Sequence, residues 1–149
     1  MRDFFTDLLK LQWLSAILAL IGLGDSVYLL WTKLSITTIV CGLGDCEAVQ
    51  ASPYSSLLGI PVAALGAGGY GALLALAVWA IFAKDNAPGW LTDVRLIFAG
   101  IGLFFAVYLT GIELFVIYQI CGWCVLQAVA ITGIFLGLLI ERKVERQVE

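Results

Sequence analysis

The segment QICGWCVLQAVAITGIFLGLLI, residues 119–140, combines two features that decide the fold. A Cys-Gly-Trp-Cys motif with Cys121 and Cys124 lies near its start, and an apolar run without charges follows. About 20 apolar residues in a helix cross a bilayer core about 30 Å thick. The segment therefore predicts a membrane-spanning helix that begins at a cysteine pair.

The rest of the chain supplies three further spans. Hydrophobic residues make up 62% of the 149 residues, against roughly 45–50% in soluble domains. The only charge between Leu96 and Ile140 is Glu113, and because this stretch is too long for one helix, we expect a break at residues 119–122. The sequence predicts an all-α integral membrane protein, a four-helix bundle forming a single domain over residues 1–149, with spans at about 11–31, 59–83, 94–118 and 121–140.

Lysine and arginine are distributed very unevenly around these spans. Only Lys33 of the eight falls on one side. The other side holds Arg2 and Lys10 before the first span, Lys84 and Arg95 in the polar loop at 84–95, and Arg142, Lys143 and Arg146 after the last span. Since positive residues favour the cytoplasmic side, we expect a cytoplasmic (inner) membrane protein with both termini in the cytoplasm. All four cysteines then lie on the extracytoplasmic side, where disulfides persist. The net charge of −3 and the absence of a basic cluster predict no nucleic-acid partner.

The chain has no histidine, so its candidate chemistry rests mainly on cysteine. The free N–H groups and the dipole at a helix start favour a thiolate, which lowers a thiol pKa from about 8.5. Cys41 and Cys46 flank Gly-Leu-Gly-Asp, a composition typical of a mobile shuttle that closes a disulfide or reaches other thiols.

Three interpretations of the four cysteines are open. Two structural disulfides would make a non-catalytic membrane protein, such as a transporter or assembly subunit. Four thiolates could instead hold zinc. The third interpretation, two redox pairs working in series, is favoured because a structural bridge has no reason to occupy the start of a membrane helix. We therefore expect no metal.

A short helix is expected in the loop between the first two spans. In SPYSSLLG, Ser52 is a candidate N-cap, Pro53 suits the first helical position and Gly59 suits the end. Such a helix would cover an outward-facing cavity.

Two carboxylates lie within spans, Asp25 in the first and Glu113 in the third, each roughly 9 Å from the outer end. An intramembrane acid suggests a function, here as a proton acceptor. The alternative is that each reaches the headgroups or bonds a neighbouring helix, and the shallow depth favours this alternative.

Together these motifs resemble those of vitamin K epoxide reductase homologues. The matching residues are Cys41, Cys46, Ser52, Gly59-Ile60-Pro61-Val62, Cys121 and Cys124. In that family, microbial members oxidise thioredoxin-like, DsbA-type partners and pass the electrons to a quinone, as DsbB proteins do. The resemblance implies a thiol–disulfide oxidoreductase with a quinone cofactor of the ubiquinone, menaquinone or vitamin K type, bound in a pocket under the loop helix.

The resemblance also implies roles for individual residues. Cys41 meets the partner, Cys46 relays electrons to Cys121, and Cys124 faces the quinone, with Ser52 near the quinone pocket. The steps are thiol–disulfide exchanges through mixed disulfides.

The chain differs from many family members at two points. Where they carry a tyrosine four residues after the last cysteine, this chain has Ala128, which bears on head-group contacts and on epoxide reduction. A vitamin K quinone or epoxide reductase is the alternative activity. The chain ends in ERKVERQVE without the thioredoxin domain that many microbial members carry, so we expect a separate extracytoplasmic partner.

Overall fold

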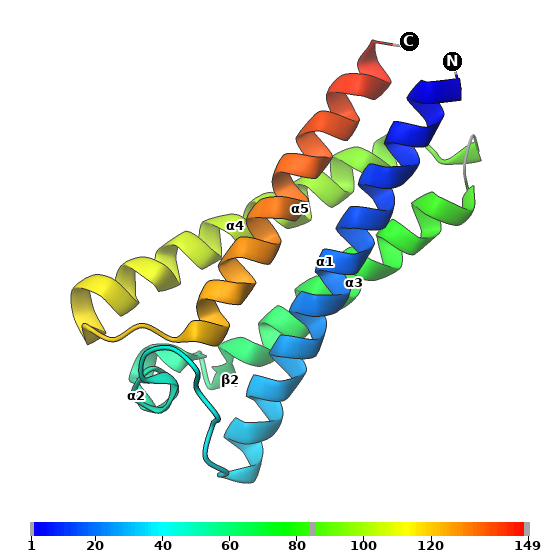
Figure 1. Cartoon of the computed structure of the whole chain (residues 1–149). Helices are drawn as coiled ribbons and strands as arrows, with labels where there is room; N and C mark the ends of the chain where they lie inside the picture. Colours follow the sequence, from blue (N-terminus) through cyan, green and yellow to red (C-terminus); the bar gives the residue numbers. More distant parts are fainter. Residues whose placement is uncertain (1, 84–85, 148–149) are drawn as a thin grey trace.

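The computed structural model describes residues 2–83 and 86–147, and four long helices dominate it (Figure 1). They are α1 (Arg2–Ser35), α3 (Val62–Ala83), α4 (Trp90–Ile112) and α5 (Gly122–Arg146). Each is long and apolar enough to cross a membrane. The chain is an all-α, multi-pass membrane protein, as the sequence predicts, and the start of α1 and the end of α5 lie at the same end of the bundle (Figure 1). Lys84, one of the cations used to predict orientation, lies outside the described residues.

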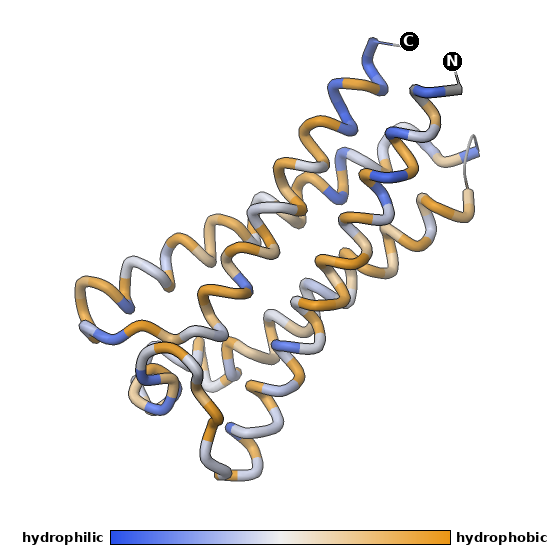
Figure 2. Tube along the Cα trace, viewed as in Figure 1, coloured by the Kyte–Doolittle hydropathy of each residue, from blue (hydrophilic) through white to orange (hydrophobic). Residues whose placement is uncertain are grey.

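The helices extend beyond the predicted spans. Hydropathy locates the part of a helix that suits lipid, whereas backbone hydrogen bonding continues as long as N–H and C=O groups can pair. Helix α5 therefore runs past Ile140 into a hydrophilic end (Figure 2). Lys143 and Arg146 in its last turn complement the negative end of the helix dipole.

Small residues let the helices approach closely in the core. Helix α1 packs against α3 and α5, and α4 packs against α5. The main buried cluster mixes alanine with larger apolar side chains: Ala19, Tyr70, Leu73, Ala99, Ala130, Ile131, Ile134 and Leu138. A Cβ on Gly22 would overlap the ring of Tyr70, which supports helix packing as the role of this glycine.

A buried polar network ties three helices together at the end where the termini lie. Arg95 Nη1 of α4 donates to Glu141 Oε1 of α5 at 3.0 Å, and both side chains are 1% exposed. From α1, Gln12 donates to the same carboxylate, and Ser15 accepts from Arg95 Nη2 at 2.8 Å. The assignment of Arg95 to a loop was therefore wrong. Its charge is tolerated inside the bundle because it is paired and hydrogen-bonded.

The predicted break between the last two spans is confirmed. Helix α4 ends at Ile112 and continues as a π-helical turn, η3 (Glu113–Ile117). Tyr118 adopts a left-handed backbone with φ 57°, and Gln119 N–H donates to the Glu113 carbonyl at 3.1 Å. The chain then leaves helical geometry, and Cys121, with φ −104° and ψ 117°, is the N-cap of α5.

The loop helix forms earlier than predicted. Helix α2 (Cys46–Ala51) begins at Asp45, whose carboxylate accepts the N–H of Ala48 at 3.0 Å. A residue before proline is driven out of the helical region, so Ser52 is extended and α2 ends there.

SPYSSLLG therefore does not form the expected helix. It forms the 3₁₀ turn η1 (Pro53–Ser55) and a two-stranded hairpin of β1 (Ser56–Leu57) and β2 (Ile60–Pro61). The two residues of the hairpin turn have φ of 52° and 84°, and the second is Gly59, which takes the left-handed conformation without strain.

Candidate active site

Cys41 and Cys46 are joined by a disulfide with a Cα–Cα distance of 5.8 Å, within the range that the spacing allowed. The two sulfurs differ in access. Cys41 is half-buried, whereas Cys46 is 0% exposed. A thiol from outside can therefore approach Cys41 but not Cys46.

The loop that carries this disulfide is fastened to the start of α5. Asp45 N–H donates to the Ile120 carbonyl at 2.9 Å, and Gly122 N–H donates to the Leu43 carbonyl at 3.0 Å. These bonds flank an antiparallel bridge between Gly44 and Cys121. In the disulfide form, the glycine-rich loop is therefore held against the start of α5.

Gly44 allows this contact for two reasons. Its φ is 77°, and a Cβ at this position would overlap the Ile120 carbonyl oxygen. The glycine lets two backbones meet, which places the disulfide beside the second cysteine pair.

Cys121 and Cys124 are free thiols one helical turn apart. Cys121 is fully buried in one cluster with Cys46 and Val49, against which Cys41 and Cys124 also pack. A hydrogen bond with Cys124 lowers the pKa of the Cys121 thiol despite the opposing effect of burial. The more acidic thiol of the pair thus lies on the side of the disulfide.

The segment before Cys41 is held at two points. Trp123 Nε1 donates to the Val40 carbonyl at 2.9 Å, and Val40 N–H donates to the Tyr28 hydroxyl at 3.2 Å. The rings of Tyr28 and Trp123 also pack together. These contacts align the half-buried Cys41 with α5.

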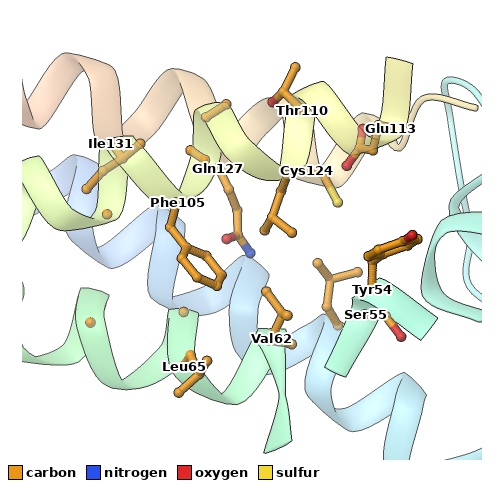
Figure 3. A pocket seen from close by; sticks show the side chains of 18 of the residues that line it. Tyr54, Ser55, Val62, Leu65, Phe105, Thr110, Glu113, Cys124, Gln127 and Ile131 are labelled. Carbon is orange, nitrogen blue, oxygen red and sulfur yellow. The ribbon is translucent and has the colours of Figure 1, made fainter. Parts of the chain in front are cut away.

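A cavity of about 420 Å³ lies on the other side of Cys124, between α3, α4 and α5 (Figure 3). Apolar side chains such as Val62, Leu65 and Phe105 form most of its wall. Polar groups gather near Cys124, where Glu113 and Gln127 also line it. An apolar chamber with a few convergent polar groups is typical of a small-molecule site, and it suits an apolar ring with polar oxygens.

Helix α2 and the turn η1 border the cavity on one side. Ser52, Tyr54 and Ser55 line it from this side. Lys33 of α1 fastens this cover by hydrogen bonds to the Gln50 carbonyl at 3.2 Å and to the Ser55 hydroxyl. The lone extracytoplasmic cation of the predicted topology thus has a structural partner.

Ser52 lines the cavity, although its expected N-cap bond is absent. Its hydroxyl donates to the Val49 carbonyl at 2.7 Å and caps no backbone N–H of η1. With its proton engaged there, the oxygen offers a lone pair as acceptor. Ala128 also lines the cavity, so its small side chain enlarges the space.

Glu113 is placed at the site by η3 and is only 5% exposed. One of its oxygens accepts the N–H of Cys121 at 3.3 Å, and its carboxylate interacts with the Cys124 thiol. The expectation that it bonds a neighbouring helix is met, but its contact with Cys124 was missed. The sequence feature that could have indicated this contact is the position of Glu113, eight residues before Cys121. The π-helical turn between them brings the carboxylate back to the cysteine.

Asp25 is equally buried, and its polar neighbour is Gln127 of α5, which agrees with the expected contact to a neighbouring helix. Its two oxygens have no hydrogen-bond partner among the described residues. The amide of Gln127 lies near it but donates to Ser26 Oγ at 3.1 Å.

Within residues 2–83 and 86–147, no three side chains of histidine, cysteine, aspartate or glutamate gather as a metal site would require. A family model described as the vitamin K epoxide reductase family matches residues 13–138. The match includes all four cysteines, Ser52, Glu113 and every element that lines the cavity.

Proposed function

Because the chain belongs to the vitamin K epoxide reductase family, we propose that it is a quinone-linked thiol–disulfide oxidoreductase. It oxidises the dithiol of a separate thioredoxin-like, DsbA-type partner and passes the electrons to a membrane quinone. The observation that carries the proposal is the order of the sulfurs. A half-buried disulfide lies at the surface, and a free thiol pair separates it from the cavity.

The partner would be oxidised at Cys41. A partner thiolate attacks the Cys41 sulfur, the bond to Cys46 breaks, and Cys46 leaves as a thiolate. The partner's second thiol then displaces Cys41, which yields the oxidised partner and reduced Cys41 and Cys46. The accessibility of Cys41 and the burial of Cys46 support this direction of attack.

The electrons would next move from reduced Cys41 and Cys46 to Cys121 and Cys124, which at this stage are joined in a disulfide. Cys46 attacks Cys121 and Cys124 leaves, then Cys41 attacks Cys46 and frees Cys121. The products are a Cys41–Cys46 disulfide and two thiols at Cys121 and Cys124, the redox state in which the four cysteines are found. The bridge between Gly44 and Cys121 keeps the reacting segments together.

A quinone bound in the cavity would be the final acceptor of the two electrons. Cys124 would face its ring, the apolar wall would hold the rest, and Ser52 would accept a hydrogen bond from a hydroxyl of the hydroquinone once it forms. Oxidation of the two thiols to a disulfide releases two electrons and two protons, which equals what a quinone requires to become a hydroquinone.

The reaction itself is tested with purified protein, a reduced DsbA-type partner and a soluble quinone. We expect one hydroquinone for each partner disulfide formed, and none from a control chain in which Cys121 and Cys124 are both serine. Partner oxidation without quinone consumption would contradict the quinone as acceptor.

We propose in addition that the cysteines face the extracytoplasmic side of the inner membrane. Arg2, Lys10, Lys143 and Arg146 belong to the end of the bundle that holds the termini, and Lys33 to the other end. Arg95 is buried in α4 and no longer counts as a loop cation, but the remaining cations still favour the end with the termini as the cytoplasmic one.

The orientation predicts which single cysteines react with a membrane-impermeant maleimide. In a chain without native cysteines, Leu58→Cys should be labelled in intact spheroplasts because Leu58 is 97% exposed in the hairpin turn. Gln147→Cys, after the end of α5, should be labelled only after permeabilisation. The reverse pattern would contradict the orientation.

A further inference from the structure

Quinone reduction by a buried thiol pair raises a proton problem that the cysteines alone do not solve. Both protons must travel from sulfur to oxygen in a chamber whose wall is mostly apolar. The chain has no histidine to carry them. A different acid–base group must therefore lie within reach of both the thiol and the cavity.

Glu113 meets this requirement. Its carboxylate interacts with the Cys124 thiol, and its side chain lines the cavity (Figure 3). The hydrogen bond from Cys121 N–H holds one carboxylate oxygen at the start of α5. The Glu113 side chain lies beside Cys124 (Figure 3). A general base has to lie within hydrogen-bond reach of the proton that it removes.

The π-helical turn explains how the carboxylate comes to lie there. Such turns are rare and occur frequently at functional sites. The widened turn of Glu113–Ile117 ends α4 next to the cysteine motif of α5. The titratable groups facing Glu113 from α5 are Cys121 and Cys124. On α2, Cys46 is in the disulfide and Glu47 is exposed.

We propose, on the basis of the function given above, that Glu113 is the catalytic acid–base group that moves a proton from Cys124 to the quinone. The S–H bond of Cys124 breaks, and its proton binds the Glu113 carboxylate. The Cys121–Cys124 bond forms as two electrons pass to the quinone. Glu113 returns its proton to a quinone oxygen, and the proton of the Cys121 thiol completes the hydroquinone.

The first test measures single-turnover quinone reduction by the prereduced protein. Glu113→Gln keeps an oxygen to accept the Cys121 N–H but cannot accept a proton. We expect its rate to fall about 100-fold at neutral pH, the lower end of what general bases contribute. The deficit should shrink as pH rises, because solvent then removes the thiol proton. If Glu113 has only a structural role, Glu113→Gln should reduce quinone at the wild-type rate. That result would overturn the proposal.

Asp25→Asn is the matched control. Asp25 is as buried as Glu113, but among the described residues its carboxylate makes no hydrogen bond to either thiol. This variant should reduce quinone at the wild-type rate. A loss equal to that of Glu113→Gln would mean that any buried carboxylate matters, and it would overturn the specific role of Glu113.

The second test needs no quinone. In a Cys121→Ser background, the pH dependence of iodoacetamide alkylation at Cys124 should show two ionisations, because thiol and carboxylate titrate as a pair. Adding Glu113→Gln should leave one, and adding Asp25→Asn should leave two. An unchanged profile with Glu113→Gln would contradict the pairing.

If Glu113→Gln does not yield folded protein, Glu113→Asp is used instead in the alkylation assay. A shift of the lower ionisation supports the proposal, and an unshifted one overturns it. Failure of the wild-type protein to reduce any quinone would instead contradict the function on which the proposal rests.

Discussion

Cys124→Ser is expected to reduce quinone only at the uncatalysed background rate, even when dithiothreitol supplies the electrons. Cys124 is the cysteine that lines the cavity, and serine cannot form the disulfide that delivers two electrons. The readout is the absorbance change of the quinone in detergent solution. A rate close to that of the wild type would mean that another sulfur faces the quinone.

The matched variant is Cys41→Ser at the surface end of the relay. It should stay within about tenfold of the wild-type rate with dithiothreitol, a change of 1.4 kcal/mol or less in the barrier. With a protein partner it should lose activity, because the sulfur that the partner attacks is gone. Equal losses for both variants with dithiothreitol would contradict this division of labour.

The second large effect is covalent trapping of intermediates. Cys46→Ala should leave Cys41 linked to the partner, because a mixed disulfide persists when the thiol that resolves it is missing. A partner adduct should accumulate on non-reducing gels during turnover and disappear on reduction. Absence of the adduct would show that Cys41 is not the cysteine that meets the partner.

The inner step is trapped with paired variants. Cys41→Ala with Cys124→Ala leaves only Cys46 and Cys121, which are buried in one cluster. Mild oxidation should join them, and peptide mapping should find the bridge. Cys46→Ala with Cys121→Ala is the control and should form no bridge. A bridge in the control alone would reverse the proposed order.

Hydropathy and cysteine spacing predicted the spans, the break before α5 and a disulfide-competent outer pair. These features depend on local sequence, since an apolar run suits lipid wherever it packs. Hydropathy could not locate α2, because a six-residue helix has too little periodicity to detect. Its position depends on Asp45 as cap and on burial of Cys46 and Val49 against the start of α5.

Long-range pairing accounts for the other differences. Arg95 was assigned to a loop because its partner, Glu141, is 46 residues away in sequence. Glu113 was assigned a structural role because its contact with Cys124 depends on a π-helical turn. The roles of Ser52 and the four cysteines in the reaction remain predictions for the variants above.

The buried pair of Arg95 and Glu141 makes the bundle mechanically asymmetric. Removing one partner of such a pair costs about 3–5 kcal/mol, so α1, α4 and α5 resist separation where the termini lie. The opposite end is covered by a short helix and a hairpin, which Lys33 and a few backbone hydrogen bonds hold in place. Unfolding of this protein should therefore begin at the end that carries the cysteines and leave the end that carries the termini assembled longest.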